Sequence, residues 1–200
     1  MWQGLRLEAK GLSCNRGGRL IFQNLNFVIS SGQLLELRGP NGSGKSSLLR
    51  LLAGLNAPES GTLEFDPTQD ALVELCHYVG HQEAIKTALT VQQNINFWQN
   101  FLGGTGASPL ETFRLGKLKD DAAGLLSEGQ RRRLALARLS AISRPLWLLD
   151  EPSVGLDQAT LQDLKTFMQS HLAQGGMIIA ATHAELGLAN AQVLNLGGRT

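Results

Sequence analysis

Short runs of hydrophobic residues recur along the chain and are separated by polar or glycine-rich segments. The runs predict strands over residues 5–12, 20–29, 33–38, 61–65, 75–79, 146–150, 177–182 and 192–196. Gly17-Gly18 lies between the first two runs and predicts a hairpin turn. One-sided leucine patterns predict helices over residues 44–53 and 157–172, and a short helix is expected between the last two strands. This alternation predicts an α/β fold: a largely parallel sheet with flanking helices, plus an N-terminal antiparallel β portion.

The pattern changes between residues 89 and 144, where strand signals stop and helical patterning dominates. Gly103-Gly104 and Ser108-Pro109 interrupt it. We predict one domain over residues 1–200, in which 1–88 and 145–200 form the core and 89–144 form an inserted α-helical subdomain. The aromatic pair Phe97-Trp98 and the later Phe101 fit two interpretations equally well, subdomain core or contact with a partner.

Composition narrows the class of protein. The 200 residues are 42% hydrophobic and 18% charged, which favours a folded chain with a sizeable core. The net charge is +1 and neither half is strongly basic, so nucleic-acid binding has no electrostatic support. No apolar run approaches the roughly 18 residues of a membrane-spanning helix, and we expect no signal peptide. The two cysteines, Cys14 and Cys76, fit a reducing cytoplasm.

A glycine-rich segment between a predicted strand and a predicted helix matches the phosphate-loop pattern G-x-x-x-x-G-K-[ST]. Its glycines let backbone N–H groups converge on phosphate oxygens at a helix N-terminus. Lys45 can reach the terminal phosphates, and Ser46 is a candidate Mg²⁺ ligand. A coincidental glycine-rich turn is the alternative. The predicted nucleotide-contacting residues are Gly39, Pro40, Asn41, Gly42, Ser43, Gly44, Lys45, Ser46 and Ser47.

Two adjacent carboxylates, Asp150 and Glu151, follow the apolar run 146–149. Ligand sites of open α/β sheets lie at the carboxyl ends of the strands. We therefore predict that Asp150 organises Mg²⁺ and that Glu151 polarises an attacking water. Taken alone, the same pattern also fits a strand that ends in a solvated turn.

The segment Leu126-Ser127-Glu128-Gly129-Gln130 precedes a run of helix-forming residues. Ser127 and Gln130 predict a capping box, and such a helix start is a second candidate phosphate site. Two helix starts are hard to bring to one nucleotide within a single subunit. Two subunits packed head to tail would solve this; an ordinary helix cap is the alternative.

These motifs, in this order and with a later Thr182-His183, resemble the ATP-binding subunits of ABC transporters over essentially the whole chain. The resemblance implies a P-loop NTPase core of the ABC ATPase type, Mg²⁺-dependent ATP hydrolysis, a head-to-tail homodimer and an integral membrane permease as partner. At matching positions it implies three further roles. Gln82 would contact Mg²⁺ and water, residues 154–157 would bridge the subunits, and His183 would lie at the γ-phosphate.

The resemblance also divides the site residues by role. Catalysis would involve Lys45, Gln82, Glu151 and His183, and the metal would be held by Ser46, Gln82 and Asp150. Ser127, Gly129 and Gln130 would contact the nucleotide of the other subunit. The family's usual adenine-stacking aromatic residue falls at Arg16 here, whose guanidinium can stack on a base. Base selectivity is left open by this departure.

Within this family, the chain is similar to the ATP-binding subunits of the haem exporter of bacterial cytochrome c maturation. The matching segments are 12–16, 80–90 and 135–139, and we expect no further domain after His183. The similarity implies a CcmB-like permease with a CcmC-like protein nearby, at the cytoplasmic face of the inner membrane. Whether haem itself is transported stays open.

Other functions compete with this one. The chain could serve another small ABC exporter, or be a soluble ABC-type ATPase that acts on nucleic acid, although such proteins usually carry two cassettes, coiled coils or basic arms. An adenylate-kinase-like phosphotransferase would leave residues 126–130 unexplained. His77, His81, His171, Cys14 and Cys76 form no haem-ligand pattern and are interpreted as structural or solvated.

Overall fold

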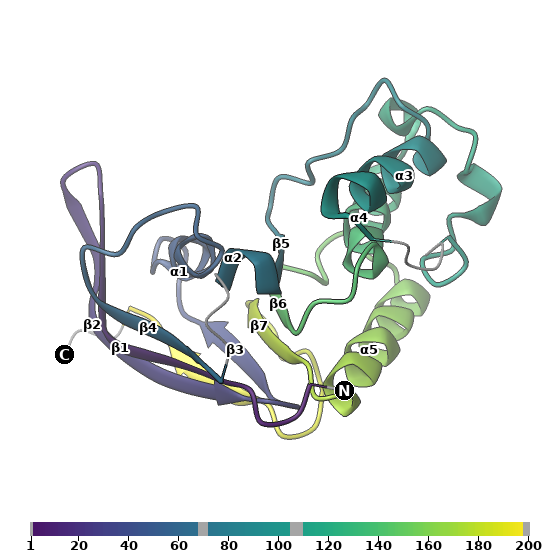
Figure 1. Ribbon diagram of the computed structural model, residues 1–200. Helices are drawn as coiled ribbons and strands as arrows, with labels where there is room; N and C mark the ends of the chain where they lie inside the picture. Colours follow the sequence, from purple (N-terminus) through teal and green to yellow (C-terminus); the bar gives the residue numbers. More distant parts are fainter. Residues whose placement is uncertain (1, 68–71, 105–109, 198–200) are drawn as a thin grey trace. The chain divides into compact units, whose positions relative to one another are not determined.

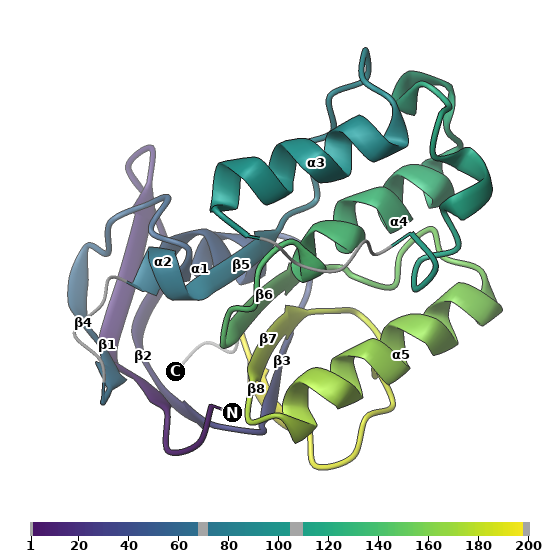
Figure 2. The same cartoon turned by 45° about the vertical axis from the view of Figure 1, so that its right-hand side comes forward.

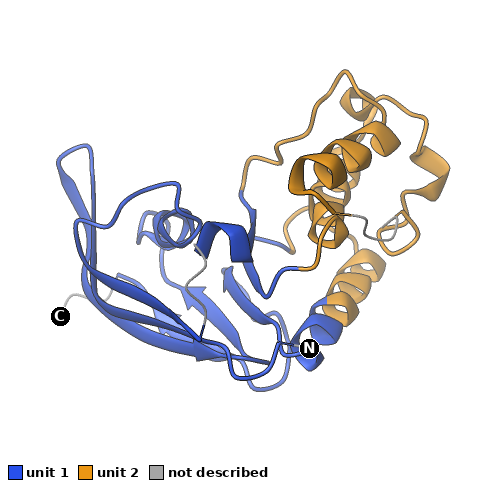
Figure 3. Cartoon of the chain, viewed as in Figure 1, with its two compact units in different colours: residues 1–80, 144–152, 168–200 blue, residues 81–143, 153–167 orange. Residues whose placement is uncertain are grey.

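The computed structural model describes residues 2–67, 72–104 and 110–197. The chain divides into two compact units (Figure 3). Unit 1 comprises residues 1–80, 144–152 and 168–200, and unit 2 comprises residues 81–143 and 153–167. None of the helices within the described ranges is both long enough and apolar enough to span a bilayer.

Unit 1 begins with a three-stranded antiparallel sheet in the order β2-β1-β4 (Figure 1). Strands β1 (Arg6–Arg16) and β2 (Arg19–Ser30) form a hairpin, and β4 (Ser60–Asp66) pairs with the other side of β1. Gly17 and Gly18 form the turn with positive φ angles, 58° and 77°, which glycine adopts without a steric penalty. The predicted hairpin and the antiparallel portion are confirmed.

The second sheet of unit 1 is parallel and has the strand order β5-β6-β7-β3-β8. In chain order, its strands are β3 (Leu34–Arg38), β5 (Cys76–Val79), β6 (Leu146–Asp150), β7 (Met177–Ala181) and β8 (Gln192–Asn195). Every residue of β6 and β7 is buried. Strands covered on both faces have no polar face, which explains their continuous apolar runs.

Helix α1 (Lys45–Leu52) lies against β6 and β7, and its leucines at 48, 49, 51 and 52 are buried. They share one hydrophobic core with residues of both sheets, such as Leu7 and Ile179. Figures 1 and 2 show α1 between the antiparallel sheet and the parallel one. A one-turn helix, α2 (Leu72–Leu75), precedes β5 and was not predicted.

The regular elements among the described residues of unit 2 are all helices, apart from one isolated bridge between Thr90 and Ala122. Its elements are α3 (Val91–Leu102), η1 (Gly116–Leu118), η2 (Ala123–Leu125), α4 (Glu128–Ala137), η3 (Arg138–Ser140) and the first part of α5 (Gln158–Ala173). The predicted subdomain, 89–144, falls in unit 2 except for Arg144, and unit 2 also includes 81–88 and 153–167. The predicted break at Ser108-Pro109 lies outside the described residues.

The short helix expected between β7 and β8 is wrong, because residues 182–191 have no helical turn. The Thr182 hydroxyl donates to the Ala184 carbonyl at 2.6 Å and accepts from the Ala184 N–H at 3.2 Å. The Leu186 N–H donates to the Glu36 side chain rather than to a carbonyl four residues earlier. Side-chain hydrogen bonds, a local pair with Thr182 and one with the distant Glu36, thus replace the helical ones.

His171, on the part of α5 in unit 1, is buried against two tryptophans. Its ring stacks on Trp147 at 3.8 Å between centroids, and the edge of Trp2 lies 5.2 Å away. Its buried Nε2 has no hydrogen-bond partner among the described residues. Burial lowers the pKa of His171 to about 4. The imidazole is therefore packed as a neutral aromatic ring.

This burial predicts a contribution of His171 to acid unfolding. The unfolded chain takes up a proton at His171 near pH 6.5, whereas the folded chain does so only near pH 4. The stabilisation is complete above pH 6.5 and falls as the pH drops toward 4, by about 2 kcal/mol at pH 5. Urea unfolding of wild type and His171→Phe at pH 7.5 and pH 5 measures this difference. Equal losses of stability in the two proteins on acidification would contradict the prediction.

Candidate nucleotide site

Three strands of unit 1 deliver the predicted catalytic loops to one edge of the parallel sheet. Leu37 of β3 pairs with Ala181 of β7, and Ala181 pairs with Asp150 of β6. Because the strands are parallel and in register, the segments after β3, β7 and β6 leave the sheet at the same level. The phosphate loop, His183 and Glu151 begin there, at the edge where open α/β sheets bind ligands.

The phosphate loop has a backbone that requires its glycines. Gly39 has φ 142°, and a Cβ there would lie 2.1 Å from the Leu196 carbonyl oxygen. Gly44, the residue before α1, has φ 101°, and a Cβ there would meet Ile21 at 2.6 Å. The loop therefore packs too closely against β2 and the end of β8 for any side chain at these two positions.

Lys45 is folded back over this loop. Its side chain is buried, and Nζ donates to the carbonyls of Gly39 at 2.7 Å and Pro40 at 3.2 Å. A buried ammonium needs such acceptors. Both are loop carbonyls, so phosphate oxygens that enter the loop can replace them as stronger, charged acceptors.

The loop also contains a buried polar atom that fits an anion. The Ser43 hydroxyl has no hydrogen-bond partner among the described residues. Ser47 is buried on the first turn of α1, whereas Asn41 and Ser46 are exposed. Unpaired donors at the start of a helix suit a phosphate group. An exposed hydroxyl at Ser46 and the carboxylate at Asp150 are oxygen donors of the type that Mg²⁺ prefers.

Glu151 is held in an unusual backbone conformation. It has φ 49°, which is uncommon for a residue with a side chain, and its N–H donates to the Ala181 carbonyl at 2.9 Å. Asp150, the preceding residue, is buried within β6. The turn therefore separates the two carboxylates, one in the sheet and one at its edge.

His183 faces Glu151 across the edge of the sheet. Its Nε2 lies 3.3 Å from Glu151 Oε1, and its side chain is 53% exposed. Unit 1 thus brings together two of the four predicted catalytic residues in direct contact. A histidine that touches a carboxylate while open to solvent can share a proton or a water with it.

Unit 2 contains the second predicted phosphate site. Ser127 caps α4: its Oγ accepts from the Gln130 N–H at 3.3 Å, and Gln130 Oε1 accepts from the Ser127 N–H at 2.7 Å. The predicted capping box is confirmed. A pocket of about 250 Å³ opens at this helix start. It is lined by Ser127, Gly129, Gln130, Arg133, Gly155, Leu156, Asp157 and Thr160.

Residues 154–157 were predicted to bridge two subunits, and three of them, Gly155, Leu156 and Asp157, line this pocket. A Cβ on Gly129 would lie 2.6 Å from the Gly155 carbonyl oxygen, so glycine permits the close approach of the two segments. Asp157 accepts the Thr160 N–H at 2.7 Å, and this hydrogen bond lowers the pKa of Asp157. This segment is thereby tied to the start of α5.

Gln82 lies in unit 2, in an exposed segment. Its neighbour Glu83 approaches Arg131 of α4, with Oε2 and Nε 3.6 Å apart, and burial raises the pKa of Glu83. Arg131 also donates to the Leu126 carbonyl at 2.7 Å. Within unit 2, the segment that carries Gln82 is therefore linked to the start of α4.

Asn94 organises the segment after Gln82 and was missed by the sequence analysis. Its buried side-chain amide accepts from the Lys86 N–H at 2.8 Å and donates to the Lys86 carbonyl at 3.0 Å and the Thr90 carbonyl at 3.0 Å. The available signal was a polar residue between Val91 and Ile95 on the buried face of a helix.

Two other predicted features lie at the surface of their own units. Arg16 is exposed at the end of β1, beside the hairpin turn. Phe97, Trp98 and Phe101 of α3 contact one another, with centroids 5.4 to 5.9 Å apart. None of the three is buried, and Phe101 is 69% exposed. Phe101 therefore does not belong to a subdomain core, whereas Phe97 and Trp98 are half-buried.

Comparison with known proteins decides the family. The ABC transporter family model matches residues 22–154. The chain belongs to the ABC transporter family. The family includes relatives named cytochrome c biogenesis ATP-binding export protein CcmA. That of Brucella abortus is 48% identical over 92% of this chain and 88% of its own length. That of Nitrobacter winogradskyi is 48% identical over 97% of this chain and 99% of its own length.

Solved structures of ABC transporter proteins confirm the predicted fold. An ATP-binding protein of a putative ABC transporter from Pyrococcus furiosus superposes with a TM-score of 0.83 at 21% identity, covering 96% of this chain and 97% of its own. CbiO1 of Clostridium perfringens, described as part of the complex cbiONQ, has a TM-score of 0.70 at 26% identity, covering 89% and 78%. The P-loop core of the ABC ATPase type is confirmed.

Proposed function

We propose that this chain is the ATP-hydrolysing subunit of a membrane export complex of cytochrome c biogenesis. Family membership supports ATP binding and hydrolysis coupled to transport. The CcmA relatives, which align over almost their whole lengths, support the specific system. The main structural support for the proposed hydrolytic site is the 3.3 Å contact between Glu151 and His183, at the sheet edge where the phosphate loop begins.

Each proposed catalytic group has a defined role. Lys45 binds the terminal phosphates with a charge that the loop carbonyls now hold in place. Glu151 accepts the proton of the attacking water, whose oxygen bonds to the γ-phosphorus as the bond to the leaving nucleoside diphosphate breaks. His183 orients this water and Glu151 through Nε2. The strained Glu151 backbone keeps the base at a fixed angle.

The pocket at the start of α4 is proposed to serve the nucleotide of a second copy of this chain. The Ser127 hydroxyl, the Gly129 N–H and the Gln130 side chain lie on or beside the pocket wall, where helix-start donors suit phosphate oxygens. Gly155, Leu156 and Asp157 of the bridging segment 154–157 line the same pocket and would meet the partner subunit there.

A magnesium ion fits the donors of unit 1, and Ser46 and Asp150 are proposed to hold it, with Gln82 as a further ligand from unit 2. When bound, such an ion neutralises charge that develops on the phosphate oxygens.

Arg16 is proposed to stack on the adenine through its guanidinium. The exposed position of Arg16 beside the hairpin turn suits this role.

The membrane partner is proposed to be a CcmB-like permease, with a CcmC-like protein nearby, at the cytoplasmic face of the bacterial inner membrane. The aromatic cluster of α3 supports a protein partner, because Phe101 exposes most of its ring. Lys86 Nζ lies 4.2 Å from the centroid of the Phe97 ring, so a positive charge lies beside the cluster.

Two measurements test this function together. Full-length chain, purified from cells that also express the membrane partners, should hydrolyse ATP and should co-purify with a permease from detergent-solubilised membranes. Hydrolysis without any membrane protein attached, combined with binding to nucleic acid, would support the soluble ABC-type ATPase instead. The identity of the captured permease separates the cytochrome c system from other small exporters.

A further inference from the structure

A buried carboxylate lies in the strand that leads to the phosphate loop. Glu36 is in the middle of β3 and is 1% exposed. It lies two residues before Arg38, which directly precedes the phosphate loop. Glutamate is almost never fully buried unless it is paired. Its burial therefore needs partners, and those partners indicate what it does.

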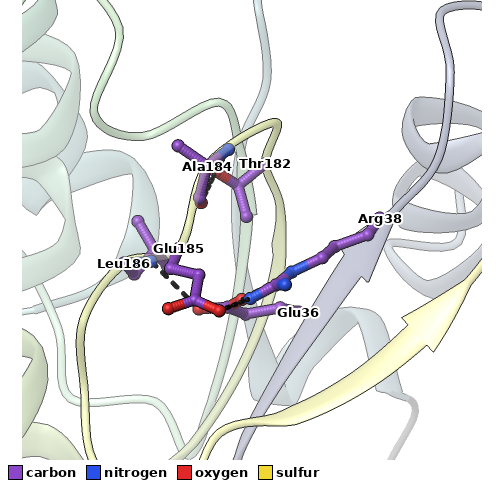
Figure 4. A network of polar contacts seen from close by, with 6 residues as sticks. All are labelled: Glu36, Arg38, Thr182, Ala184, Glu185 and Leu186. Carbon is purple, nitrogen blue, oxygen red and sulfur yellow. Dashed lines mark hydrogen bonds and ion pairs between the residues drawn. The ribbon is translucent and has the colours of Figure 1, made fainter.

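Both oxygens of Glu36 are engaged, one on each side (Figure 4). Oε2 accepts two hydrogen bonds from the Arg38 guanidinium, one from Nε at 3.0 Å and a shorter one from Nη2. Oε1 accepts from the backbone N–H of Leu186 at 3.1 Å, a residue 150 positions away in the chain. Arg38 also approaches Glu185, at 3.3 Å.

Leu186 belongs to the loop that carries His183. Two backbone N–H groups of this loop are tied to β3: the Thr182 N–H donates to the Leu37 carbonyl at 3.2 Å, and the Leu186 N–H donates to Glu36. The ion pair of Glu185 with Arg38 is a third contact between them. Only residues 183–185 lie between these two hydrogen bonds. His183 is therefore held on a short exposed arch whose two ends are both fixed to the strand before the phosphate loop.

Stability alone does not account for a charged pair at this place. Replacing a buried ion pair with apolar side chains of similar size is often neutral or stabilising, so such a pair is weak evidence for stability. A carboxylate that accepts a backbone N–H from a distant loop does something an apolar residue cannot, because it determines where that loop lies. The other end of the arch faces Glu151.

We propose that Glu36 is a positioning residue for the hydrolytic site: its carboxylate anchors the loop after β7 so that His183 stays opposite Glu151. The expected effect on hydrolysis rests on the proposed ATPase function. The anchoring of the loop by Glu36 does not depend on that function. Arg38 acts in support, since it neutralises the buried carboxylate and leads directly into the phosphate loop at Gly39.

The first test is hydrogen exchange of the full-length chain without nucleotide. In Glu36→Leu, the Leu186 N–H loses its acceptor, and we expect exchange of the peptide covering residues 182–188 to rise by about tenfold. In Glu36→Gln, one amide oxygen must serve both Arg38 and Leu186, so a smaller rise is expected. Unchanged exchange in Glu36→Leu would overturn the proposal.

The second test separates position from binding. For the same variants, kcat for ATP should fall by about tenfold for Glu36→Leu while KM changes less than about twofold, because Lys45 and the phosphate loop are left intact. The double variant Glu36→Gln, Arg38→Met should recover part of the kcat lost in Glu36→Gln. With Arg38 gone, the amide oxygen is free to accept the Leu186 N–H.

Glu8→Gln is the matched control. Glu8 also pairs with an arginine two residues away on its own strand, at 2.7 Å from Arg6, but lies in β1 away from the loop. It should keep wild-type kcat and exchange.

Increased exchange of Glu36→Leu with an unchanged kcat would overturn the positioning role. A wild-type chain that hydrolyses no ATP would instead refute the proposed function, and the exchange result would still decide the anchor.

Discussion

Glu151→Gln is expected to bind ATP almost as wild type does but to hydrolyse it about 100- to 10 000-fold more slowly, the usual contribution of a general base. The amide keeps the size of the carboxylate and can still accept from His183, so the fold of the edge is preserved. It cannot take up the proton of the attacking water. A second expected effect is accumulation of an ATP-bound dimer, because the sandwiched nucleotide persists.

Turnover assays and nucleotide titration of the purified full-length variant measure both effects, and size-exclusion chromatography with and without ATP reports the dimer. Glu64→Gln is the control: it removes an exposed carboxylate that pairs with Lys10 on the antiparallel sheet. Near-normal hydrolysis by Glu151→Gln would refute the assignment of this residue as the base and would leave His183 as the next candidate.

Lys45→Ala should weaken ATP binding by about 10- to 100-fold, the range for losing a charged hydrogen-bond donor. The wild-type ammonium is already buried over the loop, where it donates to two carbonyls, so little ordering is needed when phosphate replaces them. Alanine removes the charge and leaves those carbonyls with a donor fewer. Hydrolysis should fall with binding.

Calorimetric titration with ATP and with ADP measures this loss. The loss should be larger for ATP, because the lysine interacts with the terminal phosphates. Lys117→Ala removes an exposed lysine of unit 2 and should bind as wild type. Equal affinities of Lys45→Ala and wild type for ATP would show that the glycine-rich loop does not hold phosphate.

Local signals were sufficient for many elements. The strand predicted over residues 146–150 coincides with β6, because a strand buried on both faces reads as a continuous apolar run, here ended by Asp150. The capping box of Ser127 and Gln130 was predictable because its partners are three residues apart. The hairpin at Gly17-Gly18 was predictable because the turn itself needs residues with positive φ.

The features that the sequence did not predict lack such a local signal. The loop after β7 looks helical locally, but its backbone bonds go to Thr182 and to Glu36. Helix α2 is one turn long, too short to produce a periodic pattern. In the sequence, Glu36 interrupts the apolar residues of a buried strand, and Asn94 interrupts the apolar face of a helix. In each case one partner lies outside the strand or helix that carries the polar residue: Leu186 for Glu36 and Lys86 for Asn94.

The sequence by itself determined which segments become strands and helices, and it placed the phosphate loop, the Asp150-Glu151 pair and the cap of α4 at the ends of those elements. Each depends on residues within one or two turns of chain. Only the tertiary structure decided that the ends of β3, β6 and β7 meet in register, that Glu151 faces His183, and that Glu36 holds Leu186. These contacts depend on strand order and core packing, which join residues far apart in the chain and leave no periodic trace in it.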